Sequence, residues 1–236
     1  NIALTEGTVT SVSWVGTVTD TNGYATISSA NGVLYRSGVA GAELCSANNN
    51  NCYVDASCTL SGCSGNSCTA TCTVDVTFFA EPTDAASSYS TEYWRGWIKG
   101  IDSVSVTGVG YSTAGSPELE SMAAMDVTST IAYDPLLPGD DTSSINETTT
   151  ITNTGNTILD VEVSGDNFCT NYPTCTGYQI AVGYQEYKTS TFTYGLGTAL
   201  STTPTIIQLN LAKATANPSN SSTTLYWGMG VPNPKE

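Results

Sequence analysis

The spacing of the cysteines restricts the fold of this chain more than any other feature. Six of its eight cysteines lie between positions 45 and 72, and the other two lie at positions 169 and 175. Both groups are even, as a disulfide framework requires, although six cysteines alone allow about 15 connectivities. Cys58 and Cys72 enclose Cys63 and Cys68 almost symmetrically, as nested rungs of one antiparallel hairpin would. The spacing therefore predicts four bonds: Cys45–Cys52, Cys58–Cys72, Cys63–Cys68 and Cys169–Cys175.

A thiolate metal site is the alternative interpretation of these cysteines. The run from position 58 to 72 leaves four, four and three residues between successive cysteines, which does not match the paired C-x-x-C knuckles of zinc domains. We therefore expect no metal at the cysteines and predict an oxidising, extracytoplasmic environment. The chain begins at Asn1 rather than Met, which suggests that a secretory leader has been cleaved and that the protein is extracellular or at the cell surface.

Charge and composition exclude several classes of function. The net charge is -15 with only six Lys and Arg residues, so nucleic acids and anionic membranes are poor partners. The absence of histidine removes the commonest general base and most zinc chemistry. Glu118 and Glu120 are closely spaced but lack a shaped cleft, and no nucleotide-binding or nucleophile motif occurs. We expect no enzyme activity, no cofactor and no membrane insertion, since apolar runs are far shorter than about 20 residues.

The composition also predicts an all-β protein. Charged residues make up 11% of the chain, against about 25% in typical soluble domains, and Thr and Tyr, which favour strands, are abundant. Asn22-Gly23 stands between the β-rich runs 15–19 and 24–28, and Asn31-Gly32 precedes another, which is the pattern of hairpin turns. Further strands are expected at 70–80, where apolar and polar residues alternate, and at 93–106.

A boundary between two domains is predicted after residue 115. Residues 113–120 read as a linker, with Ser116 as the N-cap and Pro117 as the first residue of a short helix. Beyond it the sequence predicts six short strands, which is typical of an immunoglobulin-like sandwich. These strands are expected at 126–133, 147–153, 157–164, 178–184, 205–211 and 223–231.

Three segments carry a resemblance to known domains. Residues 150–165, which begin Thr-Ile-Thr-Asn-Thr-Gly-Asn-Thr-Ile-Leu, resemble a strand motif of Ig-like domains in microbial cell-surface proteins. So do residues 225–232, Leu-Tyr-Trp-Gly-Met-Gly-Val-Pro. Residues 79–98 are similar to another such module. The resemblance implies two tandem immunoglobulin-like β-sandwich domains, at residues 13–115 and 116–236.

The second of these domains is expected to lack its last strand. In modules of that kind a segment like residues 225–231 is followed by one more strand, whereas here only Pro-Asn-Pro-Lys-Glu follows, and proline lacks the amide donor that a sheet needs. An incomplete sandwich leaves an apolar groove and unpaired backbone groups. Strand alternation predicts the residues of this acceptor groove: Leu225, Trp227, Met229 and Val231.

The N-terminal residues are the candidate for the missing strand. Residues 1–12 read as extended, with Ile2 and Leu4 alternating and Val9 and Val12 following. A strand given to a neighbour resembles donor-strand exchange in chaperone-usher pilins and in the thread-like filaments of some archaea, which implies a head-to-tail homopolymer. The alternatives are that six strands satisfy the sheet and residues 1–12 pair within their own domain, or that proteolysis sets the end of the chain.

Two sites match the N-glycosylation pattern, Asn146-Glu-Thr148 and Asn220-Ser-Ser222. A covalently attached glycan would add solubility that the sparse charge does not supply.

Two further patterns would point to ligands. Tyr93, Trp94 and Trp97 could stack on sugar rings, which would make the protein a monomeric cell-surface adhesin or carbohydrate-binding module, but packing in a sandwich core explains them better. Asp20–Gly23 and Gly139–Asp141 could place oxygens around Ca²⁺. Neither completes a known calcium loop, and ordinary turn chemistry explains both better.

Overall fold

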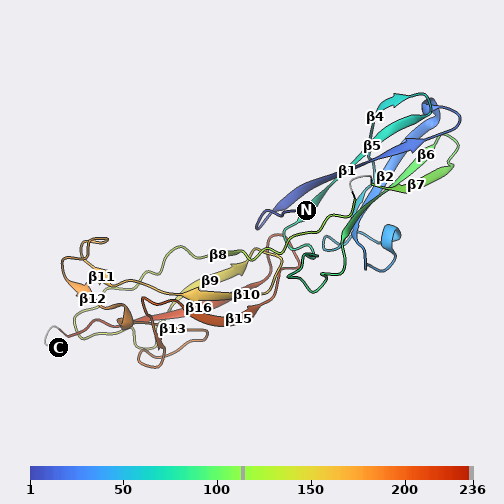
Figure 1. The fold of residues 1–236 in the computed structure, drawn as a ribbon. Coiled ribbons are helices and arrows are strands. Elements are labelled where there is room, and N and C mark those ends of the chain that lie inside the picture. Colours follow the sequence, from blue (N-terminus) through green and yellow to red (C-terminus); the bar gives the residue numbers. More distant parts are fainter. Residues whose placement is uncertain (113–114, 234–236) are drawn as a thin grey trace. The chain divides into compact units, whose positions relative to one another are not determined.

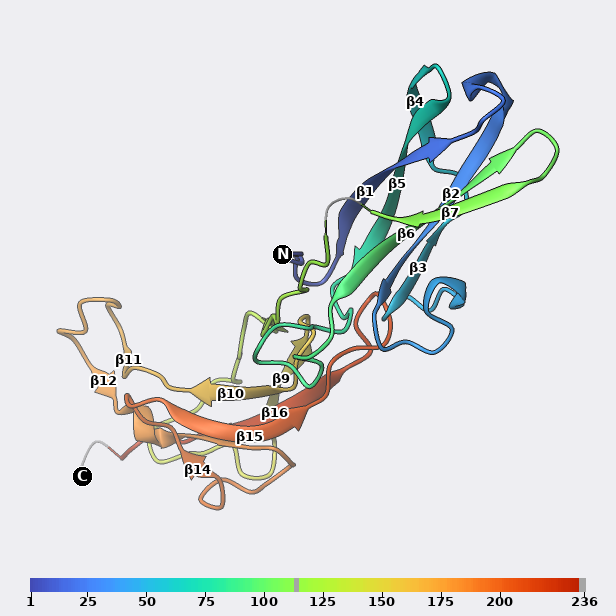
Figure 2. The same ribbon diagram turned by 45° about the vertical axis from the view of Figure 1, so that its right-hand side comes forward.

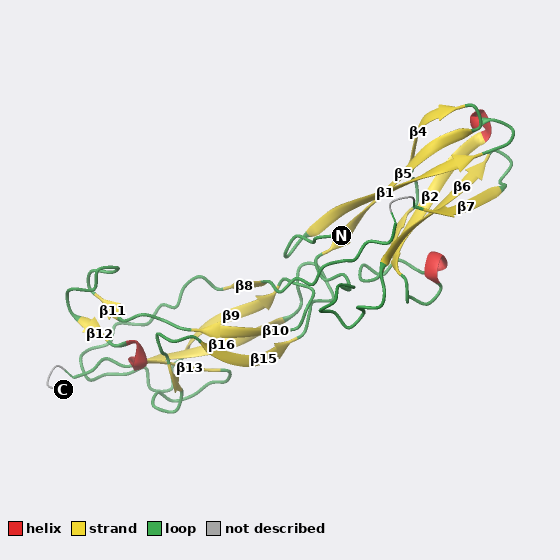
Figure 3. Ribbon diagram, viewed as in Figure 1, coloured by secondary structure: helices red, strands yellow, loops and turns green. Residues whose placement is uncertain are grey.

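The chain is all-β and divides into two compact units in the computed structural model, which describes residues 1–112 and 115–233 (Figure 1). Unit 1 comprises Asn1–Ala124, Thr154–Thr157 and Lys213–Ser219, and unit 2 comprises Met125–Asn153, Ile158–Ala212 and Asn220–Glu236. The division falls after Ala124, so it differs from the boundary expected after residue 115. The helical residues of the described chain form three short 3-10 turns (Figure 3): η1 (Tyr24–Thr26), η2 (Ala42–Leu44) and η3 (Val182–Tyr184).

Unit 1 contains two antiparallel sheets, consistent with a β-sandwich, and Figure 2 shows both. The strand order is β1-β5-β4 in one sheet and β3-β2-β6-β7 in the other. Trp14 and Val76 from the first sheet pack with Leu34 and Ile98 from the second in one buried cluster. The strands are β1 (Val9–Thr19), β2 (Ile27–Arg36), β3 (Cys52–Asp55), β4 (Thr59–Ser64), β5 (Ser67–Thr77), β6 (Trp94–Asp102) and β7 (Thr107–Tyr111).

Neither Asn-Gly pair of unit 1 joins a β-hairpin, so both hairpin predictions are wrong, although Asn22-Gly23 does lie in a turn. Asn22-Gly23 lies between β1 and β2, but β1 pairs with β5 while β2 pairs with β3 and β6, so this loop passes from one sheet to the other. Asn31-Gly32 lies inside β2. A Cβ on Gly32 would lie 2.7 Å from Cζ2 of Trp14, so this glycine makes room for a core tryptophan rather than for a turn.

The cysteine hairpin has the predicted form. β4 and β5 pair antiparallel, and the cysteines are bonded as Cys45–Cys52, Cys58–Cys72, Cys63–Cys68 and Cys169–Cys175. In β5 the predicted alternation holds at Cys72, Val74 and Val76, which are buried. Four disulfides are typical of proteins that fold in an oxidising, extracytoplasmic environment.

Residues 116–124 belong to unit 1, and the helix predicted there is wrong. Leu119 is fully buried and forms a parallel bridge with Ile2, and its carbonyl accepts a hydrogen bond from the Thr83 amide. An extended backbone places Leu119 in the core, and this burial outweighs the local capping signal of Ser116 and Pro117. Residues 113 and 114 of the predicted linker lie outside the described residues.

Unit 2 is built around a five-stranded sheet with the order β14-β13-β16-β9-β8, accompanied by the pairs β10-β15 and β11-β12. The strands predicted at 147–153 and 205–211 match β9 and β15, whereas most of 178–184 lies outside strands and ends in η3. The strands are β8 (Met125–Val127), β9 (Glu147–Asn153), β10 (Leu159–Val163), β11 (Phe168–Cys169), β12 (Gln179–Ile180), β13 (Gln185–Lys188), β14 (Thr198–Ala199), β15 (Thr205–Leu211) and β16 (Ser222–Met229).

Candidate functional site

Unit 2 has an open groove between β8 and β10. β8 pairs with β9 and β10 pairs with β15, and within residues 115–233 no other strand pairs with either of them. The groove encloses about 370 Å³. Its lining is mainly apolar, with Met125, Val127, Ile131, Tyr133, Ile151, Val161, Val163, Phe168, Leu225 and Trp227 beside a few Thr and Ser residues, Glu162 and Gln185.

The floor of the groove is buried and its rim is exposed. Ile151, Leu225 and Trp227 are buried, and the indole nitrogen of Trp227 donates a hydrogen bond of 2.8 Å to Thr149 Oγ1. At the rim, 46% of the Met125 surface and 40% of the Val127 surface are exposed. An apolar floor flanked by two open strand edges is the arrangement that accepts an added β-strand.

Two polar side chains of the groove, Gln185 and Tyr133, are hydrogen-bonded to each other. Gln185 Nε2 donates a hydrogen bond of 2.8 Å to the hydroxyl oxygen of Tyr133. Burial raises the pKa of Tyr133 to about 12, so its hydroxyl stays neutral at physiological pH. The groove therefore favours an apolar occupant over a charged one.

The predicted acceptor residues are only partly those of the groove. Leu225 and Trp227 line the groove, whereas Met229 and Val231 do not. Met229 is buried and Val231 is half-buried. The expectation of unpaired backbone beside these residues is wrong, because β16 lies inside the sheet and pairs with β9 on one side and β13 on the other. The strand β13 has only four residues, too few for a sequence pattern that would place it beside β16.

The predicted donor residues divide into two groups. Val9 and Val12 belong to β1, which pairs with β5 along its whole length, so a boundary at residue 12 falls inside a strand. Residues 1–8, here called the N-terminal arm, precede β1 and are mostly exposed. In the arm, Ile2 is buried against unit 1 and its amide donates a 2.7 Å hydrogen bond to the Glu118 carbonyl, while Leu4 packs half-buried against the same core.

A second opening lies in unit 1, along β1, β6 and β7. It encloses about 500 Å³ and is larger than the groove of unit 2. Glycine and threonine supply much of its lining, and Asp20 and Asp102 stand among them. A strand placed there would bury less apolar side-chain surface, so the groove of unit 2 is the stronger candidate.

Unit 1 contains a cluster of charged side chains around Glu81 that no sequence pattern indicates. Arg36 Nε donates a 2.6 Å hydrogen bond to Glu81 Oε2 and Arg36 Nη1 contacts Glu92, while the amides of Asn50 and Asn51 donate to Glu81 at 2.8 and 2.9 Å. Burial opposes the charge on Glu81, but the bonds from Asn51 and Arg36 and the Arg36 charge lower its pKa overall. Glu81 is therefore an ionised carboxylate at neutral pH, held in place by these hydrogen bonds.

Lys213 completes this cluster. Its Nζ donates hydrogen bonds to Asn50 Oδ1 at 2.7 Å and to the Phe79 carbonyl at 2.8 Å. Desolvation lowers the pKa of Lys213. Two of the six basic residues of the chain, the buried Arg36 and the partly buried Lys213, therefore lie in one cluster. Because they are far apart in the sequence, no local pattern indicates that they meet.

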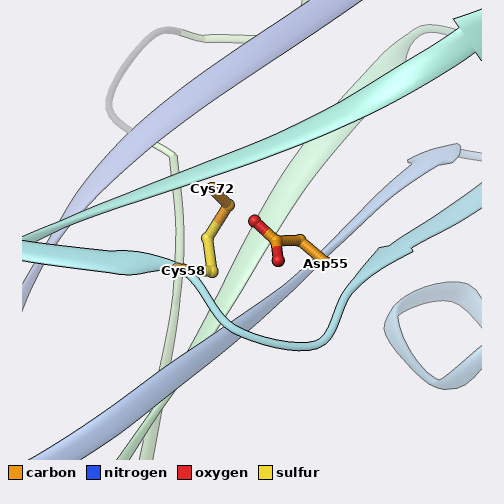
Figure 4. A group of neighbouring side chains, drawn as sticks. All are labelled: Asp55, Cys58 and Cys72. Carbon is orange, nitrogen blue, oxygen red and sulfur yellow. A yellow bond between two sulfur atoms is a disulfide. The ribbon is translucent and has the colours of Figure 1, made fainter.

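The only described group of acidic and cysteine side chains with metal-like spacing does not form a thiolate site. Asp55, Cys58 and Cys72 place their ligand atoms within 4.8 Å of one another, but the two sulfurs are bonded to each other (Figure 4). The Asp55 carboxylate accepts hydrogen bonds from the amides of Ser57 and Thr73. The group is explained by a disulfide and a carboxylate that stabilises a turn.

The two oxygen-rich turns are held by their own side chains. Asp20 accepts hydrogen bonds from the Asn22 amide and the Thr26 hydroxyl, and Asp141 accepts one from the Ser143 amide. These contacts are the turn chemistry that the sequence favoured over Ca²⁺.

Two of the three aromatic residues of the possible sugar-binding surface are packed inside unit 1. Trp94 is fully buried and its indole nitrogen donates to the Glu81 carbonyl, and Trp97 is also buried. Tyr93 lies half-buried beside the Arg95 guanidinium. The core-packing interpretation of the two tryptophans is confirmed.

The two glycosylation patterns lie in different surroundings. Asn146 Nδ2, the atom that would carry the glycan, is buried without a hydrogen-bond partner among the described residues, and Asn146 Oδ1 accepts a bond from the Phe192 amide. Asn220 is exposed. The folded chain therefore favours Asn220 as the accessible acceptor.

Comparisons with family models, with curated proteins and with solved structures find no match to this chain. Within the part of the chain that the structure describes, no helix is long and apolar enough to cross a membrane. The function is therefore inferred from the groove, the N-terminal arm and the disulfides.

Proposed function

We propose that this chain is a structural subunit of an extracellular filament, secreted through a cleaved leader and built from tandem Ig-like β-sandwich domains. The groove between β8 and β10 carries the proposal. In filaments of this kind a β-strand from another copy lies in the groove and pairs with an open strand edge. Such a strand would cover Met125, Val127 and Phe168, which are partly exposed.

The N-terminal arm of another copy is the proposed occupant. In an extended strand Ile2 and Leu4 point to the same side, which suits an apolar floor, and Ala3 and Thr5 on the other side are uncharged. Ile2 and Leu4 must both leave the core of unit 1 before the arm can be exchanged. Burying a side chain of this size is worth about 1.5–3 kcal/mol, so burial of Ile2 and Leu4 in the groove offsets that loss.

An exchange of this kind generates a polymer. The donor segment belongs to unit 1 and the acceptor groove to unit 2, so donor and acceptor are different surfaces. Contacts between different surfaces are heterologous and produce open filaments unless a ring closes. Because each copy carries a net charge of -15, salt should favour assembly by screening repulsion between copies.

Negative-stain electron microscopy and sedimentation velocity of the concentrated full chain test the proposal. We expect filaments from the natural sequence and soluble monomers from the double variant Ile2→Asp/Leu4→Asp. The matched control is Ala3→Asp/Thr5→Asp, which places the same charges on the other side of the arm and should leave filaments intact. On the acceptor side, Val127→Asp should abolish filaments, whereas Val109→Asp at the opening of unit 1 should not.

A binding measurement provides a second test that does not depend on filament formation by the arm variants. A fluorescein-labelled peptide of residues 1–8 should bind the natural chain and not the Val127→Asp variant, as read from fluorescence anisotropy. Monomers at every concentration, together with no peptide binding, would overturn the proposal. The runner-up function, a monomeric adhesin or carbohydrate-binding module, would then be tested with a glycan-binding screen.

A further inference from the structure

Three side chains of unit 1 are arranged as reactants for a new covalent bond. Lys213 Nζ lies 2.7 Å from Oδ1 of Asn50, next to the carboxamide carbon that an amine attacks. The nitrogen that would leave, Asn50 Nδ2, lies 2.8 Å from Glu81 Oε1. We propose that Lys213 and Asn50 become joined by an intramolecular amide bond between their side chains, with Glu81 transferring the proton.

The surroundings favour the amine as a nucleophile. Lys213 is followed by Ala214, which is fully buried in one cluster with Phe78 and Phe79. A poorly solvated site disfavours the ammonium form, and an unprotonated amine is the reactive species. The neighbouring charges act in opposite directions, since Glu81 favours the ammonium and Arg36 disfavours it, and burial has the largest effect on the pKa of Lys213.

The carboxylate is held in place for the proton transfer. Glu81 Oε2 accepts hydrogen bonds from Arg36 Nε and Asn51 Nδ2, which leaves Oε1 directed at the Asn50 amide. Positioned acid–base groups require contact distances of about 2.6–3.2 Å to the atom that gains or loses the proton. The bond from Asn50 Nδ2 satisfies this requirement.

The reaction balances without an oxidant or a co-reactant. The unprotonated Nζ of Lys213 attacks Cγ of Asn50 and forms a tetrahedral intermediate. Glu81 accepts a proton from Nζ and returns it to Nδ2 of Asn50. The Cγ–Nδ2 bond then breaks, the Cγ–Nζ bond remains as a secondary amide, and one molecule of ammonia leaves.

The product would be a covalent cross-link between residues that are far apart in the sequence. Residue 50 precedes β3 and residue 213 follows β15, so the bond would fasten Lys213–Ser219 permanently to the rest of unit 1. A cross-link that closes a long loop restricts the unfolded chain, which raises stability. The inference is independent of filament assembly, because it concerns unit 1 alone.

Mass spectrometry of the purified full chain tests the bond directly. After complete reduction of the disulfides, the intact mass should be lower than the sequence mass by one ammonia molecule. A protease digest should contain one branched peptide that joins the segments around Asn50 and Lys213, and no cleavage should occur after Lys213. A full sequence mass with normal cleavage after Lys213 would overturn the proposal.

Variants distinguish ammonia lost in forming the proposed bond from ammonia lost by other reactions. Asn22-Gly23 and Asn31-Gly32 can lose ammonia by cyclising locally, but that loss would persist in Lys213→Arg and Asn50→Ala, whereas loss through the proposed bond would disappear in both. Lys188→Arg is the matched control, because Lys188 Nζ donates a hydrogen bond to the Leu196 carbonyl in unit 2, and this variant should keep the branched peptide. Glu81→Gln should slow its formation at least tenfold. A branched peptide that forms equally fast without the carboxylate would exclude Glu81 from proton transfer.

Discussion

At the scale of single residues, several glycines of unit 1 are explained by their neighbours and not by turns. A Cβ on Gly96 would lie 2.5 Å from Cδ1 of Trp14, and one on Gly32 would lie 2.6 Å from the Cys72 sulfur. The indole of Trp14 fits between the sheets because both positions lack a side chain. The Trp14 Nε1 group also donates a hydrogen bond to the Trp97 carbonyl, so the tryptophan has a partner for its polar atom.

Gly32→Ala should therefore destabilise the chain by about 1–3 kcal/mol, the usual cost of overpacking a core. The added methyl group meets a disulfide sulfur and an indole ring, and neither can move freely. Gly108→Ala is the matched control, since it also lies within a strand but has open space around the new Cβ. Urea unfolding followed by tryptophan fluorescence measures both. Equal midpoints for the two variants would contradict the packing argument.

Glu81 should make unit 1 sensitive to acid. Its folded pKa lies below its ordinary value of 4.5, so its stabilising effect is complete above that pH and is lost as the pH falls through the lower folded value. The comparison uses a Lys213→Arg background, in which the amide bond cannot form. There Glu81→Gln should cost about 1.5–3 kcal/mol at neutral pH, because the buried Arg36 loses one charged hydrogen-bond partner but keeps its contact with Glu92. Urea unfolding at pH 7 and pH 3 checks this. Between pH 7 and pH 3, the Glu81→Gln protein should lose less stability than its Lys213→Arg parent. An equal loss in the two proteins would contradict the assignment of the acid sensitivity to Glu81.

At the scale of elements, the β4–β5 hairpin shows how disulfides support a short edge strand. Cys58–Cys72 joins the residue before β4 to the middle of β5, and Cys63–Cys68 closes the tip. The two bonds enclose 14 and 5 residue steps and differ in burial, since Cys63 is exposed and Cys72 fully buried.

Removing the two bonds should therefore have unequal effects. Replacing Cys58 and Cys72 by Ala should cost about 3 kcal/mol, and replacing Cys63 and Cys68 should cost about 2 kcal/mol, because the loop-closure entropy rises with loop length. Thermal unfolding of the two double variants under oxidising conditions measures the difference. A larger loss from the Cys63/Cys68 pair would refute this ranking.

The strands of unit 2 show which elements local patterns predict. β9 and β15 were predicted at their observed bounds, because each has a clear run of Thr and Ile or Leu residues. β13 and β14 have four and two residues, too few for a pattern, yet β13 pairs with β16. As a result β16 is not an edge strand, and the open edges beside the groove are those of β8 and β10.

At the scale of the whole molecule, the proposed assembly depends on features that the two units hold separately. Unit 2 supplies an apolar groove with open edges, and unit 1 supplies the N-terminal arm and the buried cluster around Glu81. Sparse charge, four disulfides and the proposed amide bond would all suit a protein that must persist outside the cell.

Sequence patterns predict the all-β class and the strands with strong alternation, because these depend on side-chain type within short segments. Cysteine spacing favours the four observed pairs without excluding the other connectivities. The tertiary structure alone decided the open edge of unit 2, the place of Ile2 and the meeting of Asn50, Glu81 and Lys213. The physical reason is that strand partners and buried polar contacts are selected by packing between residues far apart in the chain. Gly32 is an example: the dipeptide Asn31-Gly32 predicts a hairpin turn from local sequence, whereas in the folded chain Gly32 makes room for Trp14.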